Sequence, residues 1–463
     1  MSEQNNPRII DGLDVDMNPA VAELAPTPIV FPEAPAAPVK RRWLSNLILT
    51  FTLIADNNES GIVSTLFALI RLDLGVGLGV LGILTALAKL IAAIFGPLWV
   101  LLARRVNRKL VLVGATVVFG LLTIAIGFSQ NFTQFLILFV IATIGTVAAL
   151  PIITEIVGDL FPDKLRGSAT GMMFGLLGLV GAITTPLLGQ LANIPHGWRV
   201  GYYIVGAAMG IAGLLTLVAV YDPGRGATES VQTRSAERAP HVPALSWSDV
   251  RQLFRIPSYV LMLVSRLLSG HLLLQSFGVI YLVTVFHYTL PQATLIFGPG
   301  QIGYVLGSFV GGISSDQASK ASPRYGRILM LQLAQFFFAV VAFFGTQFNW
   351  GVAILIVFFF AMFFLQGVNP GINRPIVYAV VPPALRGAAF AVMLSIVESI
   401  GWAIYNLLAG FLGQQFGLQP VFLAVLVVVM LVNTAVIFLL YRTYWPDVQK
   451  VQADFQQQPQ QAA

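Results

Sequence analysis

Long apolar segments recur along this chain, and most are separated by very short polar linkers. A helix needs about 20 apolar residues to cross a bilayer, where every backbone polar group must be satisfied within the segment. Only 10% of the residues are charged, against roughly 25% in soluble domains. We therefore predict an all-α membrane protein with twelve spans, at residues 44–70, 75–103, 109–128, 132–158, 167–192, 197–221, 257–284, 290–314, 326–347, 350–380, 385–414 and 419–444.

A polar, basic segment at residues 222–256 follows the sixth span. It divides the chain into two predicted six-helix bundles, at 43–221 and 257–445. Residues 1–42 are polar and proline-rich and lack the basic start and apolar core of a signal peptide, so we expect a disordered tail there. Residues 446–463 are expected to form a second tail.

Basic residues gather on one side of the predicted spans. They precede the first span, follow the second, fourth, eighth, tenth and twelfth, and occupy the central linker, whereas the other side offers only Arg71 and Arg199. By the positive-inside rule, both termini and the linker are cytoplasmic in a multi-pass protein of the cell membrane. The net charge of +6 is then a topology signal and does not indicate nucleic-acid binding.

The two halves repeat one another. FPDKLRGSATG, at 161–171, follows the fourth span, and VPPALRGAAFA, at 381–391, follows the tenth. Arg166 and Arg386 match at a shift of 220 positions, and we expect both to hold the loops between helices. Glu155 and Asp159 are expected to pair with loop arginines. A duplicated six-helix unit is typical of transporters that rock two halves around a central site.

These features resemble the major facilitator superfamily. Its loop after the second helix reads G-x-x-x-D-R-x-G-R-K; the second-half copy here keeps the glycine, aspartate and arginine positions, and the first-half copy keeps basic ones. The resemblance implies two pseudo-symmetric six-helix bundles that alternate access to a midplane site. It also implies that the cytoplasmic gating loops contain Arg105, Arg108, Arg166, Gly312, Asp316, Arg327 and Arg386.

The first helix carries a second resemblance. ESGIVSTLFALIRLDLG, at 59–75, is similar to the first helix of multidrug, metabolite and spinster-type lipid transporters. Ser60 follows the acidic residue where spinster-type proteins have arginine. In the fourth helix, Ile141 stands where proton-coupled relatives often have arginine.

Ionisable residues fall near the middle of several predicted spans. Such residues cost roughly 2.5–3.5 kcal/mol at the bilayer centre and usually face a cavity or a partner. By the resemblance, helices 1, 4, 7 and 10 line the cavity, and Pro370 and Gly371 are candidates to break helix 10 near it. The predicted substrate and proton pathway contains Asp56, Glu59, Lys89, Arg266, His271, Arg374, Glu398, Trp402 and Asn406.

Plainer roles remain open for several of these residues. Lys89 is an alternative ion-pair partner of Asp56 or Glu59, which would fix helix 2 to helix 1. His271 is alternatively a hydrogen-bonded helix contact, and Trp402 a packing residue. Because acids and bases are mixed in the predicted cavity, the charge of the cargo and the direction of transport stay open.

The predicted function is secondary active transport of a small molecule, coupled to protons through a carboxylate such as Glu59, by a monomer. A lipid or lysolipid carrier of spinster-like type is the main alternative, followed by a non-transporting receptor and a membrane enzyme. The four histidines are scattered and there is no phosphate-binding loop, so we expect no metal, no cofactor and no enzymatic activity.

Overall fold

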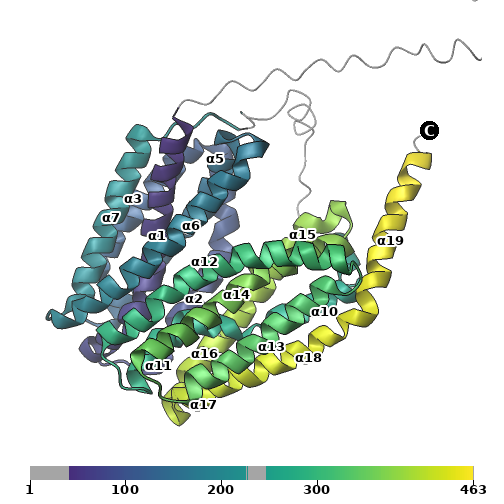
Figure 1. Cartoon of the computed structure of the whole chain (residues 1–463). Coiled ribbons are helices and arrows are strands. Elements are labelled where there is room, and N and C mark those ends of the chain that lie inside the picture. Colours follow the sequence, from purple (N-terminus) through teal and green to yellow (C-terminus); the bar gives the residue numbers. More distant parts are fainter. Residues whose placement is uncertain (1–40, 226, 228–246, 462–463) are drawn as a thin grey trace, which may run out of the picture.

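The computed structural model describes residues 41–225, 227 and 247–461, which are almost entirely helical (Figure 1). Asparagine side chains cap two of the first helices, where Asn107 accepts from the backbone N–H of Lys109 and Asn131 from that of Gln134. The first half contains α1 (Arg42–Leu74), α2 (Leu78–Arg105), α3 (Arg108–Ile126), α4 (Phe132–Thr146), α5 (Ala149–Leu160), α6 (Asp163–Gly189), η2 (Gln190–Asn193) and α7 (Gly197–Ala219).

In the second half, three spans are each built from more than one helical segment, joined by a short 3-10 or π-helical segment. It comprises α10 (Pro257–Leu267), η3 (Gly270–Leu272), α11 (Leu273–Thr284), α12 (Leu290–Ala321), α13 (Gly326–Gln347), α14 (Val352–Val380), η4 (Pro383–Leu385), α15 (Arg386–Phe390), the π-helical η5 (Ala391–Val397), α16 (Glu398–Phe416), α17 (Leu418–Phe422), the π-helical η6 (Leu423–Val428), α18 (Val429–Phe438) and α19 (Leu440–Gln461). The short α9 (Trp247–Leu253) lies in the predicted linker.

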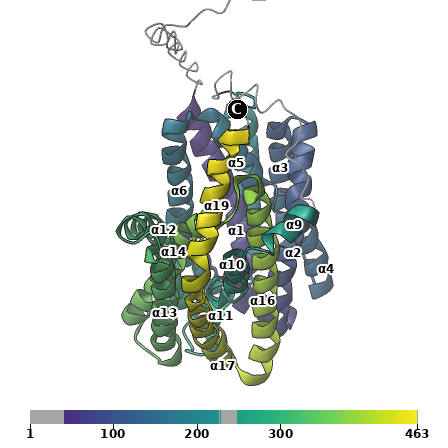
Figure 2. The ribbon, with the colours of Figure 1, turned by 90° about the vertical axis from the view of Figure 1, so that its right-hand side faces the viewer.

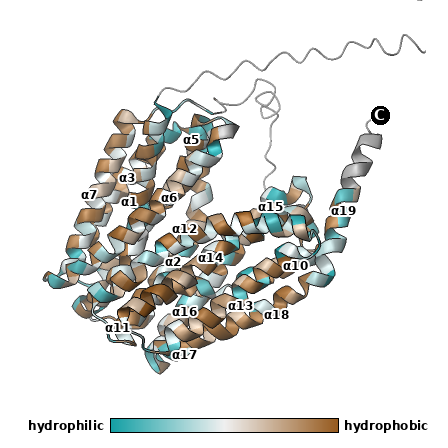
Figure 3. Cartoon of the chain, viewed as in Figure 1, coloured by the Kyte–Doolittle hydropathy of each residue, from teal (hydrophilic) through white to brown (hydrophobic). Residues whose placement is uncertain are grey.

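Eleven helical segments of the described chain are long and apolar enough to cross a membrane. The remaining predicted span, the first in the chain, is α1, which has 33 residues but carries the polar run 56–60 in its middle, and this run lowers its hydropathy. Figure 3 shows hydrophobic residues covering most of the helical surfaces, as expected for helices that face lipid. The all-α fold with two helical bundles is confirmed.

Four segments differ from the prediction. The span expected at 132–158 is broken by a turn at residues 147–148, between α4 and α5. The span expected at 257–284 is interrupted at residues 268–272, where Ser269 leaves the helical conformation with ψ 64°. The expected break of helix 10 is wrong, because α14 runs unbroken through Pro370 and Pro375. The segment after residue 446, expected as a tail, continues α19 as a helix as far as Gln461. The tail expected at 1–42 lies, apart from Arg41 and Arg42, outside the described residues.

The continuity of α14 has a local explanation. Pro370 has no N–H, so the carbonyl of Gln366 loses its helical partner. The Asn369 side-chain amide donates to that carbonyl at 3.3 Å and to the Leu365 carbonyl at 3.1 Å. Gln335 of α13 donates to the Asn369 oxygen and fixes this amide. The freed backbone acceptor is thereby satisfied inside the membrane.

The start of α1 and the end of α19 lie at the same end of the molecule, called the terminal end below (Figures 1 and 2). At the opposite end the halves meet chiefly through two helix pairs, α2 with α16 and α6 with α12, and α1 also contacts α11. The first pair crosses at glycines, because a Cβ on Gly410 would lie 3.1 Å from the Gly79 Cα and 3.2 Å from the Gly82 Cα. In the second pair, a Cβ on Gly298 would lie 2.8 Å from the Ala182 carbonyl. We call these contacts the opposite-end seal.

Candidate functional site

A cavity of about 1,590 Å³ lies between the two halves. Its wall extends from Asp56 and Lys89, near the middle of α1 and α2, to Arg166 and Gly167, at the terminal end of α6. In Figure 1 the halves diverge toward α5 and α15, at the same end. The opposite-end seal closes the other side, so the cavity faces the terminal end.

The structure brings seven predicted pathway residues to the cavity wall. They come from α1, α2, α10, η3, α14 and α16, which are far apart in the sequence. The seven are Asp56, Lys89, Arg266, His271, Arg374, Glu398 and Trp402.

The other two predicted pathway residues, Glu59 and Asn406, are outside the cavity lining of the described chain. Glu59 is 1% exposed and lies near Tyr202 of α7, because three residues along a helix rotate its side chain by about 60° from Asp56. Asn406 is fully buried in the α2–α16 crossing, where it accepts a hydrogen bond from Thr85 at 3.0 Å and donates to the Trp402 carbonyl at 2.7 Å. It belongs to the contact between the halves.

Arg266 and Glu398 form an ion pair within the second half. The Arg266 Nη2 lies 2.5 Å and its Nε 3.0 Å from the same Glu398 oxygen, Oε2. Both side chains are partly exposed to the cavity, at 12% and 24%. Since removal of one partner would leave an uncompensated charge at membrane depth, we expect the two to act together.

Lys89 contacts the opposite half of the molecule. Its Nζ lies 3.9 Å from the centroid of the Trp402 ring, close enough for a cation–π interaction. It also interacts electrostatically with Arg266 and Glu398. No carboxylate of the described residues forms an ion pair with Lys89, so the alternative pairing with Asp56 or Glu59 is wrong. The reason is the orientation of α2, which turns this side chain toward α16.

His271 lies in the interruption between α10 and α11. It is 1% exposed, packs edge-on against Phe338 at 5.7 Å, and its Nδ1 has no hydrogen-bond partner within the described part of the chain. The interruption frees the carbonyl of Leu267, which accepts a hydrogen bond from Tyr405 of α16 at 2.9 Å. The alternative role of His271, as a hydrogen-bonded contact between helices, is therefore not supported at Nδ1.

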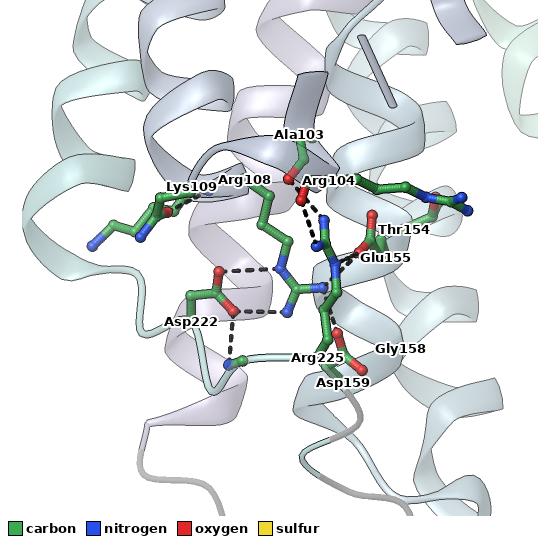
Figure 4. A network of polar contacts seen from close by, with 12 residues as sticks. Ala103, Arg104, Arg108, Lys109, Thr154, Glu155, Gly158, Asp159, Asp222 and Arg225 are labelled. Carbon is green, nitrogen blue, oxygen red and sulfur yellow. Dashed lines mark hydrogen bonds and ion pairs between the residues drawn. The ribbon is translucent and has the colours of Figure 1, made fainter. Parts of the chain in front are cut away.

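The predicted gating loops of the first half contain a buried ion-pair network at the terminal end (Figure 4). Arg108 is 3% exposed and binds Asp222 through Nη2 at 2.7 Å and Nε at 3.1 Å. Its Nη1 contacts Glu155 at 3.1 Å and also Asp159. This confirms that Glu155 and Asp159 pair with a loop arginine. Arg225 adds a contact to Glu155 at 2.6 Å.

Asp222 lies after the end of α7, outside the spans. Burial by itself raises the pKa of its carboxyl, but the hydrogen bonds from Arg108 and the Gly224 N–H, with the charges of Arg108 and Arg225, lower the pKa below its ordinary value. Asp222 and Arg225 were not among the residues predicted from the sequence. Their position at the start of the basic linker, directly after a span, was the one available signal.

Arg166 and Arg386 make matching contacts in the two halves. Arg166 Nε donates to the Gly158 carbonyl at 3.1 Å, and Arg386 Nη2 to the Tyr378 carbonyl at 2.9 Å, eight residues upstream in each case. Both arginines thus hold a loop, as predicted, and Arg166 also reaches the cavity wall.

The remaining loop residues differ in their contacts. Arg105 is exposed. Asp316 and Arg327 form a long ion pair at 3.8 Å. Gly312 lies at the crossing of α12 and α14, where a Cβ on Gly371 would lie 3.0 Å from its Cα.

A second cluster, at the opposite end, joins Asp73 to three residues at the start of α7. His196 Nδ1 lies 2.9 Å from Asp73 Oδ1, Trp198 Nε1 donates to Oδ2 at 2.8 Å, and Arg199 approaches Oδ2 at 3.4 Å. Asp73 lies in the stretch 59–75 that resembles the first helix of known transporters. The cluster fixes the end of α1 to α7, away from the cavity.

Comparison with known proteins gives one family. The model of the Major Facilitator Superfamily matches residues 48–396. The benzoate transport protein of Acinetobacter baylyi is 23% identical over 69% of this chain and 74% of its own length. The multidrug resistance protein MdtG of Escherichia fergusonii is 27% identical over an aligned region that covers 41% of this chain and 44% of MdtG.

Solved structures share the fold. A bacterial homolog of the human lysosomal transporter Spinster, in an inward-facing and occupied conformation, has a TM-score of 0.75 at 18% identity and covers 88% of this chain and 99% of its own. The D-xylose-proton symporter has a TM-score of 0.64 at 16% identity, over 87% and 97% of the two chains.

Proposed function

Since the chain belongs to the Major Facilitator Superfamily and is a multi-pass membrane transporter rather than an enzyme, we propose that it moves a small molecule by alternating access coupled to protons. The observation that carries this proposal is the 1,590 Å³ cavity between the halves, which faces one end while the other is sealed. Transport then requires the α2–α16 and α6–α12 contacts to separate while the terminal end closes.

We propose that the Asp56 carboxylate binds and releases the coupled proton. It reaches the wall of the cavity, and Glu59 lies one helical turn further along α1, toward α7. Two carboxylates this close titrate as a pair, so one proton can be held between them and released when the cavity changes sides. A membrane potential supplies about 2.3 kcal/mol per charge per 100 mV to drive the cycle.

The proposed orientation puts the terminal end in the cytoplasm. Arg104, Arg105, Arg324 and Arg386 lie there, which supports this orientation by the positive-inside rule. With this orientation the described conformation is inward-facing. The functional units are the bundles at 43–221 and 257–445, and the transporter acts as a monomer, because one chain supplies both walls of the cavity.

Proton flux into proteoliposomes that contain a pH-sensitive dye tests this function. The compounds to screen are aromatic acids, drugs and sugars, because relatives and structural neighbours are named for benzoate, multidrug resistance and D-xylose. Lysolipids are added to test the alternative function. Asp56→Asn should abolish compound-driven proton flux, and Glu59→Gln should slow it. Asp73→Asn, which removes a carboxylate from α1 outside the cavity, is the matched control and should retain flux.

Two results would count against the proposal. Proton flux that survives Asp56→Asn would exclude this carboxylate from coupling. A labelled compound that crosses without proton flux would replace proton coupling with uniport or another ion.

A lipid or lysolipid carrier is the second candidate. A recess of about 200 Å³ between α2 and the α16 segment is lined by the apolar Ala92, Ala93 and Leu394, together with the polar and charged residues Lys89, Ser395, Glu398 and Ser399 and the Trp402 ring. The exposed Leu90 and Ile396 are next in sequence to its lining residues Lys89 and Ser395. A lysolipid that drives more proton flux than any organic acid in the same vesicles would favour this candidate.

A further inference from the structure

We propose that the cargo carries a carboxylate on an apolar body and that Arg374 is the residue that binds the carboxylate. This inference rests on the proposed transport function and deepens it by giving a chemical class to the cargo. It follows from the charges of the cavity wall, the exposure of Arg374, and the buried polar groups and aromatic residues that line the same cavity.

The charges of the cavity wall do not balance. Its acidic residues are Asp56 and Glu398, and its cationic side chains come from Lys89, Arg166, Arg266 and Arg374. Glu398 is neutralised by Arg266 at 2.5 Å. Of the cations, Lys89 and Arg374 form no ion pair with any carboxylate of the described residues. The wall therefore has an excess of positive charge, which attracts anions into a cavity with low-dielectric walls.

Arg374 is the more accessible of these two cations. It is exposed on α14, about two turns from Gln366 toward the terminal end, and it faces the cavity. Tyr304 of α12 lies close enough to interact electrostatically with it. A guanidinium presents five N–H donors in a planar fork that matches a carboxylate with two parallel hydrogen bonds. Lys89, by contrast, already rests on the Trp402 ring.

Two buried polar side chains on the same wall have atoms without partners. Gln366 is 3% exposed, and no described residue bonds to its Oε1; the same holds for Nδ1 of His271, which is 1% exposed. An unsatisfied buried polar atom is costly. Both side chains line the cavity, so a polar group of a bound cargo can reach them. Because Gln366 Oε1 only accepts, a hydroxyl or N–H elsewhere on the cargo, and not its carboxylate, would bond to it. These positions indicate a ligand that carries polar groups rather than a pure hydrocarbon.

Aromatic residues from both halves also line the wall. Phe174 comes from α6, Phe297 and Phe309 from α12, and Trp402 from α16. Phe174 and Phe309 are 42% and 54% exposed, so their ring faces are available for contact. An aromatic or long apolar body packs against such rings, while its carboxylate reaches Arg374. A cationic amphipath would instead meet two unpaired positive charges.

Binding of matched probes to the purified protein tests this inference. The probes are 2-naphthoate, 2-naphthamide and 2-naphthylmethylamine, together with decanoate, decanamide and decylamine, each titrated by calorimetry. We expect the carboxylates to bind most tightly in each series. Arg374→Gln should weaken carboxylate binding roughly 10- to 100-fold. Arg374→Lys keeps the charge but loses the fork and should weaken it less.

Arg324→Gln is the matched control, because it removes one exposed arginine whose guanidinium rests on Tyr325 at the terminal end, away from the cavity wall. It should bind every probe as the unmodified protein does. Melting temperatures of all variants establish that they fold. If Arg374→Gln does not fold, Arg374→Lys decides the question, because it must lower carboxylate affinity and leave amide affinity unchanged.

Several results would overturn the inference. They are tighter binding of the amines or amides, carboxylate affinity that is unchanged in Arg374→Gln, or no binding by any carboxylate. A cationic or neutral compound that drives proton flux would leave transport standing and reject the anionic cargo. Carboxylate binding that depends on Arg374, without flux of any compound, would instead support the anion site and reject the transport function.

Discussion

Lys89 of α2 and Trp402 of α16 meet across the junction of the two halves, with the Lys89 Nζ 3.9 Å from the centroid of the Trp402 ring. The contact lies beside the Arg266–Glu398 ion pair, on the wall of the cavity. It therefore joins the first half to the charged site of the second. A conformational change that separates α2 from α16 must break it.

Ser308 and Thr294 of α12 should differ in chemical reactivity. The chain has no cysteine, so single cysteines can be introduced without a background. Ser308 lines the open cavity, whereas Thr294 is fully buried beside Gly189 in the opposite-end seal. Ser308→Cys should react with a membrane-impermeant maleimide added from the terminal side, and Thr294→Cys should be protected.

The side from which Ser308→Cys reacts in intact cells also tests the orientation. Reaction only after the cytoplasmic face is made accessible supports cytoplasmic termini. Equal reactivity of both cysteines would show that the protein does not rest in the conformation with an open terminal end.

Gly82→Leu should open the opposite-end seal. A Cβ at Gly82 would collide with the Asn406 backbone carbonyl, so a larger side chain must push α2 away from α16. Overpacking of this kind costs about 1–3 kcal/mol, and the cost falls only on the conformation in which the seal is closed. We expect Thr294→Cys to become reactive in this background. Gly96→Leu, where a Cβ has open space, is the control on the same helix and should leave Thr294→Cys protected.

Trp402→Leu should destabilise the conformation with an open terminal end. A partly desolvated cation–π contact contributes about 0.5–2 kcal/mol, and this one exists only while α2 and α16 are together. The labelling rate of Ser308→Cys should therefore fall. Trp43→Leu removes a tryptophan that packs on Phe161 within the first half and should leave the rate unchanged. A rate that is equal in both variants would reduce Trp402 to a packing residue.

Asp222 should make stability depend on pH at the terminal end. Because its pKa is lowered in the folded protein, its contribution is fully present above the unfolded value of about 3.9 and is lost as the pH falls through the lowered pKa. Thermal unfolding in detergent should show a decline below about pH 4 that Asp222→Asn makes smaller, because the variant has already lost this contribution.

The cost of Asp222→Asn at neutral pH should be about 1–3 kcal/mol, because Arg108 keeps Glu155 and Asp159 as partners. If stability declines below about pH 4 to the same extent in Asp222→Asn and in the unmodified protein, Asp222 does not contribute to that decline.

Local sequence determined the spans, the repeat and the class of the protein. Each helix satisfies its own backbone hydrogen bonds, so the apolar length of a segment decides whether it crosses the membrane, whatever its neighbours. The matching contacts of Arg166 and Arg386 are local in the same way, since each joins residues eight positions apart.

Tertiary structure decided which side chains share a site. Asp56 and Glu59 look equivalent in sequence, but the rotation of α1 against α7 turns only Asp56 to the cavity. Lys89 contacts Trp402, and Arg108 binds Asp222, across separations that only the packing of distant helices can close. At the interruption at 268–272, the freed Leu267 carbonyl accepts from Tyr405 of α16, and the Asn369 amide that supports α14 at Pro370 is fixed by Gln335 of α13. Hydropathy places a helix in the bilayer, whereas its rotation and its partners come from contacts between helices, which the local sequence does not encode.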